Sequence, residues 1–500
     1  MKSLELASVT ALLLLSSAAA QADVSISNKP TKNMSCSVGV CTATAQKAVL
    51  NVGDLQTMLA GGDATVKTGS VTNDIDVDQP LAWTSTSRLT LDARQSVVVR
   101  KAVTVAGTGA LTIATNDGGQ NGEFFVMPRG NVMFWDVSSD LNINGQHYQL
   151  LLTLPDIIHA IKKSQKYKRA AYLALAGSIS SAGSYRSAPI AAFDYGVLEG
   201  LGNAIAGLNI SNAGAAYTGL IAMLGAEVHN LNVTSVTITG TNDRAGGIAG
   251  LNHGTIANSS VSGSVSAQYA AGGLVGENYG TIVFSSASGR ISGEFAGGLV
   301  GSNKGGGRIS FAHSDATVSS DYLAGGLVGA NTDQYTCADT LIMRSYATGS
   351  TNGSGYAGGL AGLNQAAQIV DSYSTGAVNT SSSAGGLVGW NLDDSLCAGK
   401  VPEISSSYST GTVSGSILGG FIGSDVSDSA LDSTNWDLDT SGISDPHQGA
   451  GNVLDDPGIT GLSDSQLKSG LPGGFDPKTW GQSPNINNGY PYLLANPPPK

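Results

Sequence analysis

The most reactive side chains in this 500-residue sequence are its four cysteines, and their spacing favours disulfide chemistry. Cys36 and Cys41 enclose only Ser-Val-Gly-Val, a loop short enough to close as a disulfide hairpin when both side chains face the same way. A metal site would need His or further Cys ligands nearby, and the flanking sequence supplies none. We therefore predict a disulfide between Cys36 and Cys41.

Carboxylates and histidines are the groups that a hydrolase or lyase would use, as two or three acids converging with a Lys, Arg or His. The acids of the central region fall at different positions of its repeated pattern, so most should point in different directions: Glu277, Glu294, Asp315, Asp321, Asp333, Asp339, Asp371, Asp393, Asp394 and Glu403. No His-Glu-x-x-His, Gly-x-Ser-x-Gly, phosphate loop or Cys/His zinc spacing is present. We expect a protein that is not an enzyme and uses no cofactor. A polysaccharide lyase or hydrolase whose acids do converge is the alternative.

The elements that must position these residues are copies of one phrase, Ala-Gly-Gly-Leu-Val-Gly-x-Asn. Copies begin at Ala245, Ala271, Ala296, Ala324, Ala357 and Ala384, with a degenerate seventh at Leu418 and a degenerate forerunner at Thr218. They start about 25 to 35 residues apart. This period is typical of solenoid repeats, in which each repeat buries its apolar side chains only by stacking on its neighbours. Short Val and Ile runs between Gly turns predict strands, and hence an all-β solenoid.

Aligned copies place like residues in columns that should stack coil on coil. One inward column holds Ile256, Ile282, Ile309, Ile342, Ile369 and Ile404, and a second holds Val265, Ile291, Val318, Thr351, Val378 and Val413. The paired glycines are expected at tight corners with positive φ. A structural amide ladder is predicted for Asn252, Asn278, Asn303, Asn331, Asn364 and Asn391, ending at Asp425. An Asn-lined binding groove is the alternative.

A further column ends in three tyrosines from consecutive coils, Tyr346, Tyr373 and Tyr408. On an outer face such a stripe could stack sugars or dock a protein. The alternative is a ladder that shields its own sheet. This stripe is the best candidate recognition surface that the sequence offers.

The fourth and sixth copies carry insertions after the Asn, and each insertion holds a cysteine, Cys337 or Cys397, at the same offset. Two coils separate them, about 9.6 Å at strand spacing, whereas a disulfide needs Cα atoms within about 7 Å. Loops of this length can lean across the fifth copy, so we predict a Cys337–Cys397 clamp. Asp333, Asp393 and Asp394 lie in the same loops; solvated acids are favoured there over a weak calcium site.

Residues 155–176 interrupt the strand pattern and predict a helical insertion that Pro155 can start. Its cations form a basic patch on an acidic protein: Lys162, Lys163, Lys166, Lys168 and Arg169. The patch could contact an anionic surface or partner. A solvated helix face lying over the solenoid is the favoured interpretation.

Composition and charge limit the compartment and the partners. A net charge of −12 argues against nucleic acid, because binding phosphates needs a basic field. Residues 1–22 are typical of a secretory signal peptide, with Lys2, a short apolar run and a small-x-small cleavage site before Asp23. No other stretch is long and apolar enough for a transmembrane helix. We expect a secreted or surface-exposed protein without a membrane-spanning segment.

The composition shifts divide the chain into successive segments. They are a signal peptide (1–22), an N-terminal capping segment (23–62), first coils (63–154), the basic helical insertion (155–176), lead-in coils (177–244), the repeat region (245–425) and a C-terminal cap (426–500). Within the cap, a short helix is expected over 462–471, and Trp480 with residues 490–494 is expected to plug the last coil. A bare end of the stack would otherwise leave open strand edges.

Three runs resemble the stalk of filamentous-haemagglutinin-like secreted adhesins: LAWTSTSRLTLDA (81–93), VTVAGTGALTIATNDGG (103–119) and FWDVSSDLNINGQHYQLL (134–151). The Gly-rich phrase resembles the GLUG motif of bacterial surface adhesins and of the non-catalytic part of some IgA-cleaving peptidases. The resemblance implies a right-handed parallel β-helix that binds a glycan or a host or matrix protein, or serves as a surface scaffold. Unlike large haemagglutinin-like proteins, the chain has no Asn-Pro-Asn secretion domain.

Overall fold

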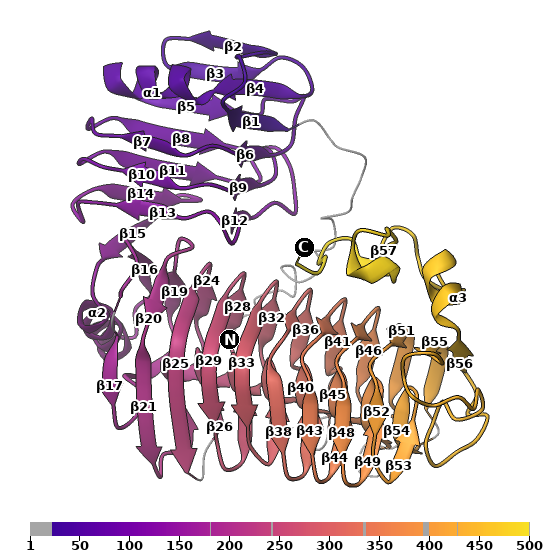
Figure 1. Ribbon diagram of the computed structural model, residues 1–500. Coiled ribbons are helices and arrows are strands. Elements are labelled where there is room, and N and C mark those ends of the chain that lie inside the picture. Colours follow the sequence, from indigo (N-terminus) through magenta and orange to yellow (C-terminus); the bar gives the residue numbers. More distant parts are fainter. Residues whose placement is uncertain are drawn as a thin grey trace. The chain divides into compact units, whose positions relative to one another are not determined.

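The computed structural model describes residues 23–180, 182–241, 244–333, 337–393, 400–427 and 429–499. The predicted signal peptide, Asp394 and Cys397 lie outside these residues. The described chain is an all-β parallel solenoid with three α-helices, α1 (Val52–Gly61), α2 (Leu154–Tyr167) and α3 (Asp464–Ser469). It divides into two compact units, the first comprising residues up to Ser180 with 196–205 and 228–232 and the second comprising the rest (Figure 1).

The first unit stacks short parallel strands into three faces. One sheet contains β1 (Val24–Ser27), β4 (Ala48–Asn51), β6 (Ile75–Val77), β9 (Val97–Val99) and β12 (Phe124–Val126), and a second contains β7 (Leu81–Trp83), β10 (Val103–Val105) and β13 (Val132–Phe134). The third includes β3 (Val40–Ala43), β5 (Ala64–Lys67), β8 (Arg88–Asp92), β11 (Ala110–Ala114) and β14 (Asp140–Ile143). Buried and partly exposed residues alternate along most of these strands, so one apolar row per strand fills the interior.

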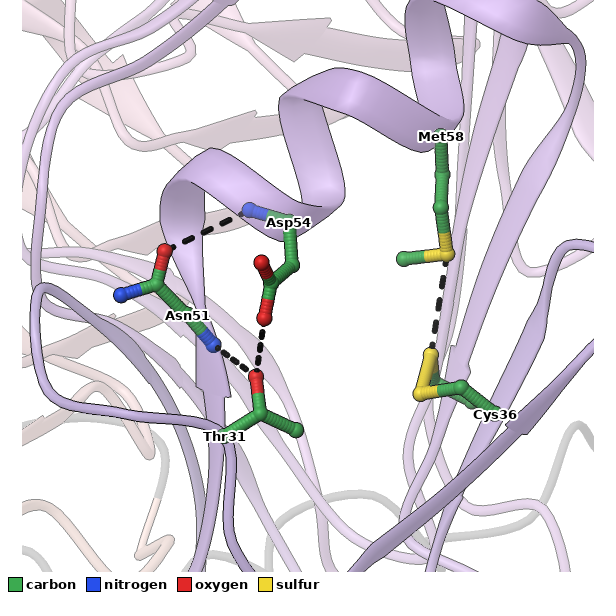
Figure 2. Close-up of a disulfide and its surroundings, with 6 residues drawn as sticks. Thr31, Cys36, Asn51, Asp54 and Met58 are labelled. Carbon is green, nitrogen blue, oxygen red and sulfur yellow. Dashed lines mark hydrogen bonds between the residues drawn. A yellow bond between two sulfur atoms is a disulfide. The ribbon is translucent and has the colours of Figure 1, made fainter.

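The first unit begins with a disulfide-closed hairpin and a capped helix. In the antiparallel pair of β2 (Met34–Ser37) with β3, Cys36 lies directly opposite Cys41, and the two form the predicted disulfide. Figure 2 shows this bond beside Met58 of α1, whose sulfur lies 3.9 Å from the Cys41 sulfur. The Asn51 side chain caps α1 by accepting hydrogen bonds from the Gly53 and Asp54 amides.

The helical insertion is shorter than the sequence predicted. Helix α2 ends at Tyr167 because Lys168 adopts a left-handed conformation with φ of 50°. The following residues form a strand instead, β16 (Ala171–Leu175), which pairs in parallel with β15 (Gln146–Leu151) and β19 (Gly196–Glu199). The residues Ala171–Leu175 include no β-branched side chain, and their spacing suits a helix. They form a strand because strands pair with them on both edges, and this tertiary pairing overrides the local preference.

The second unit carries the repeats on three faces. The nine-stranded sheet holds β18 (Ile190–Phe193), β23 (Ile221–Leu224), β27 (Ala249–Asn252), β31 (Val275–Asn278), β35 (Val300–Lys304), β40 (Val328–Thr332), β45 (Ala361–Gln365), β50 (Val388–Leu392) and β54 (Ile422–Val426). The eight-stranded sheet holds β22 (Tyr217–Thr218), β26 (Arg244–Gly246), β30 (Ala270–Gly272), β34 (Phe295–Gly297), β39 (Leu323–Gly325), β44 (Tyr356–Gly358), β49 (Ser383–Gly385) and β53 (Ile417–Gly419).

The third face of the second unit holds the predicted apolar columns. Ile256 pairs with Ile282, and the Ile column then continues strand by strand to Ile404 through β28 (Thr255–Ala257), β32 (Thr281–Val283), β36 (Arg308–Ser310), β41 (Leu341–Met343), β46 (Gln368–Val370) and β51 (Glu403–Ser409). The Val265-to-Val413 column pairs in the same way. Both predicted columns are confirmed in register and buried.

The motif glycines are required by close approach, and the expectation of positive φ for them is wrong. None of the glycines in the repeated phrase has φ in the left-handed range. A Cβ on Gly272 would lie 2.0 Å from the Val275 carbonyl oxygen, and one on Gly298 would lie 2.1 Å from Ser314 Oγ. The two walls of each coil touch here, with no room for a side chain.

A large ring ends one interior column of small residues. Ser374 pairs with Ser409, and Ser409 pairs with Trp436 of β55 (Ala430–Asp437). Trp436 is fully buried, and its ring packs directly against Gly420. A Cβ on Gly420 would lie only 2.0 Å from the Trp436 ring. Trp436 therefore fills the interior space that serines occupy in the preceding coils.

Candidate functional site

The predicted Asn ladder is present and lies inside the protein. From Asn252 to Asn391 each Nδ2 donates to the Oδ1 of the next Asn at 2.7–3.1 Å, and Asn391 donates to Asp425 Oδ2 at 3.1 Å. All six amides are fully buried. The ladder also binds turn backbone, as where the Gly254 amide donates to Asn252 Oδ1 at 3.1 Å. It does structural work, and its burial is incompatible with an open Asn-lined groove.

The three predicted tyrosines do stack, but they are not an accessible surface. Successive ring centroids lie 4.8 Å apart for Tyr346 and Tyr373 and 5.1 Å apart for Tyr373 and Tyr408. All three side chains are buried. This corrects the expectation of an exposed recognition stripe: the tyrosines project from the outer face of the sheet, where another part of the chain covers them.

The cover is the C-terminal strap, residues 463–499, which includes α3 and β57 (Trp480–Gly481) (Figure 1). Leu467, Phe475, Trp480, Tyr490 and Leu493 of the strap pack with the three tyrosines in one buried cluster. The strap extends along the stack as far as Asn496, which donates to the Ala312 carbonyl at 3.2 Å. Trp480 and Tyr490 therefore shield the outer face of several coils, whereas the sequence suggested a plug over the last one.

The two inserted loops meet across the fifth repeat, as their length suggested. Lys400 Nζ lies 2.8 Å from Asp333 Oδ2 and 3.1 Å from Asp339 Oδ1. Asp333 is thus paired with a cation rather than open to calcium, and Asp394 lies outside the described residues. The pairing of Cys337 with Cys397 stays a prediction because Cys397 also lies outside them.

The basic patch is solvent-exposed on α2. Leu154, Ile157 and Ile161 are buried beneath the helix, whereas Lys162, Lys163, Lys166, Lys168 and Arg169 are exposed. None of these five cations forms an ion pair within the described part of the chain. The geometry fits the solvated helix face and leaves the contact-patch alternative untested.

The second unit has an aromatic run that the sequence did not suggest, and we call it the outer aromatic column. Its rings come from five consecutive coils: Tyr269, Phe295, Tyr322, Tyr356 and Trp390. Neighbouring centroids lie 4.8, 5.7, 6.4 and 4.4 Å apart. Tyr322 is 40 % exposed and the other four are partly buried. The rings lean on the buried side chains of Leu323, Ala330 and Leu363.

An ion triad lies at one end of the outer aromatic column. The buried Glu277 carboxylate pairs with Arg244 at 3.0 Å and with Lys304 at 2.6 Å. Arg244 also lies over the Tyr269 ring, 4.7 Å from its centroid. Burial lowers the pKa of the Lys304 ammonium, but the hydrogen bond and charge of the Glu277 carboxylate outweigh burial. The pKa of Lys304 therefore lies above its ordinary value, and the ammonium stays charged. The triad fixes the first ring of the column.

A polar cavity of about 460 Å³ adjoins the column. Its lining residues are Ala267, Gln268, Ser292, Gly293, Glu294, Ser319, Ser320 and Asp321. Gln268, Glu294 and Asp321 directly precede the rings of Tyr269, Phe295 and Tyr322 in the chain. Burial is the main cause of a raised pKa for the Tyr322 hydroxyl, and Tyr356 and the Glu294 carboxylate raise it further. The cavity therefore borders the first three rings of the column along the chain.

Two absences apply to the described residues alone. They contain no group of three or more His, Cys, Asp or Glu side chains placed to hold a metal ion. Among them, too, no helix has both the length and the apolar character that crossing a membrane requires.

Comparison with known proteins gives one motif and two partial likenesses. The GLUG motif matches residues 380–414. Halomucin of Haloquadratum walsbyi (strain DSM 16790 / HBSQ001) is 41 % identical over 73 residues, which span 14 % of this chain and 1 % of halomucin. A solved structure of a candidate immunoglobulin A1 protease from Bacteroides ovatus is 16 % identical, with a TM-score of 0.37, over 70 % of this chain and 93 % of that one. The haemagglutinin-like resemblance is not among these matches and stays a prediction. The chain therefore carries a GLUG motif at residues 380–414, within a row of repeats whose columns are confirmed.

Proposed function

We propose that this chain is an adhesin-like protein of the cell exterior that binds a glycan or a host or matrix protein through the side of its β-helix and catalyses no reaction. The observation that carries the proposal is the outer aromatic column. The Ile, Asn and Tyr ladders of the second unit are buried, whereas this column stays partly open to solvent. Exposed aromatic runs beside polar groups are typical of binding surfaces.

The disposition of the acids supports the non-catalytic part of the proposal. Glu277 is buried between two cations and Asp333 is paired with Lys400. Asp371 is bound by Arg344 at 3.4 Å and by the Trp480 indole at 3.1 Å. These carboxylates are engaged in structure, which suits a scaffold better than general acid–base chemistry.

Binding of the purified protein to immobilised glycans and to extracellular-matrix proteins tests the proposal. We expect saturable binding to at least one of these partners. Absence of binding to both panels by a folded protein would reject it. Incubation with polysaccharides tests the enzymatic alternative, and new reducing ends or unsaturated products would establish a lyase or hydrolase instead.

A further inference from the structure

The outer aromatic column has the dimensions of an extended ligand. Parallel strands in neighbouring coils lie about 4.8 Å apart, so five rings from five coils extend over about 20 Å. The column is one ring wide. A protein partner would need a broad patch of roughly 800 Å² on each side, whereas a narrow row suits a single chain lying along the stack.

The way the rings are presented suits flat, partly apolar units. Tyr269 meets Phe295 with ring planes at 64°, and Phe295 meets Tyr322 at 80°, so the rings alternate between edge and face. Tyr356 and Trp390 are stacked at 14°. A pyranose ring presents C–H groups on its face and hydroxyls at its rim. Its face can pack on an aromatic ring while its rim stays hydrogen-bonded.

The adjoining cavity supplies partners for such a rim. Gln268 offers an amide, Ser292 and Ser319 offer hydroxyls, and Glu294 and Asp321 offer carboxylates. Among the described residues, no cation lines the cavity. Carboxylates accept hydrogen bonds from sugar hydroxyls but repel uronates and sulfates. The charge pattern therefore selects against acidic polysaccharides and favours uncharged ones.

We propose that the outer aromatic column, with the cavity lined by Gln268, Glu294 and Asp321, is a binding site for a neutral, hydroxyl-rich glycan chain that lies along the stack of coils. This inference rests on the proposed function and names its ligand class and its site. The rings grip the sugar faces, and the polar side chains set the register of the chain.

Affinity electrophoresis of the full chain in gels containing galactomannan, xyloglucan or dextran as neutral probes, and alginate as the acidic probe, tests the site. We expect retardation by at least one neutral polysaccharide and none by alginate. The double substitution of Tyr322→Ser and Tyr356→Ser should weaken binding about tenfold or more, because two aromatic contacts are lost. Tyr195→Ser is the matched control, since Tyr195 is 39 % exposed against 40 % for Tyr322 and lies outside the column. Thermal unfolding of each variant establishes that it is folded.

The possible outcomes separate this inference from the proposed function. Neutral-glycan binding that survives the double substitution would overturn the site and leave the function standing. Binding to matrix proteins or alginate without any neutral glycan would overturn the ligand class alone. Failure to bind any glycan or matrix protein would overturn both.

Discussion

Tyr408 donates a hydrogen bond through its phenolic hydroxyl to the carbonyl oxygen of Pro491 at 2.6 Å, across a separation of 83 residues. Asn487 strengthens this contact by donating to both Tyr408 Oη and the Pro491 carbonyl at 2.8 Å. The C-terminal strap is thus fastened over the tyrosine ladder. A surface that would otherwise be apolar and open becomes part of the core.

The strap gives the three tyrosines different roles. The hydroxyls of Tyr346 and Tyr373 are buried without a hydrogen-bond partner among the described residues. A buried polar group left unpaired costs about 1–3 kcal/mol. Tyr373→Phe should therefore be neutral or raise the free energy of unfolding, whereas Tyr408→Phe should lower it by about 1 kcal/mol. Denaturant unfolding of the two variants measures the difference. Equal effects would mean that the Tyr408–Pro491 bond does not stabilise the protein.

The Asn ladder should fail when one link is removed. Asn331→Ala strips Asn303 of its acceptor and Asn364 of its donor, and both remaining amides are fully buried. We expect a loss of roughly 2–4 kcal/mol in the free energy of unfolding. Asn379→Ala is the control, because Asn379 is an exposed strand residue. A similar small effect of both changes would contradict the structural role of the ladder.

The close approach of coil walls predicts a steric effect at the second motif glycine. A Cβ on Gly386 would lie 2.1 Å from the Gly420 carbonyl oxygen and 2.6 Å from Ser409 Oγ. Gly386→Ala should lower stability by about 3 kcal/mol or more, as overpacking against backbone does. Gly470→Ala is the matched control, since nothing lies within 4 Å of its Cβ position. If thermal melting curves of the two variants coincide, the glycine is not needed for packing.

The first unit should become less stable between weakly acidic and neutral pH. Burial raises the pKa of the Glu199 carboxyl to about 7, above its ordinary value of 4.5, although Leu201 and Asn230 donate hydrogen bonds to it. A carboxyl whose folded pKa is raised contributes its full stability below pH 4.5 and loses it as the pH rises to about 7.

Glu199→Gln removes this titration. Thermal unfolding at pH 5 and pH 8 should show a decline in stability that is larger for the native protein than for the variant, by on the order of 2–3 kcal/mol, because the raised pKa of Asp23 stays in both. Identical pH profiles of the native protein and Glu199→Gln would show that another group controls the transition.

The clamp between the inserted loops can be checked chemically. Lys400 already brings the loops together at Asp333. Peptide mass mapping without reduction should recover Cys337 linked to Cys397, separately from the Cys36–Cys41 peptide. Alkylation of Cys337 and Cys397 as free thiols in the unreduced protein would refute the clamp.

Most of the fold of the second unit can be predicted from the repeat period of the sequence. Residues such as Ile309 and Asn303 recur at fixed positions of each copy, so alignment of the copies alone predicts their register, and their pairing is confirmed. The degenerate copy at Thr218 is also confirmed, with Thr218 opposite Ala245. Its ladder position holds Leu224, opposite Asn252, which explains why the amide ladder starts one coil later.

The outer aromatic column is missed by the same alignment because its rings alternate between positions. Tyr269 and Tyr322 lie two residues before the phrase, Phe295 and Tyr356 lie one before it, and Trp390 lies inside it. A search for rings near the phrase, tolerant of a one-residue shift, would find them. The strap could not be predicted, because it is not repeated and its partners lie up to 184 residues away, as for Asn496 and Ala312.

Trp390 offers the most direct measurement of the central claim, that a ligand lies on the outer aromatic column. Tryptophan fluorescence should be followed while the neutral polysaccharide that retards the protein is titrated. We expect a saturable change in fluorescence for the native protein that disappears in Trp390→Phe, which keeps a ring at the position and retains binding. A fluorescence change of the same size in Trp390→Phe, or no change while binding occurs, would place the ligand elsewhere than on the outer aromatic column.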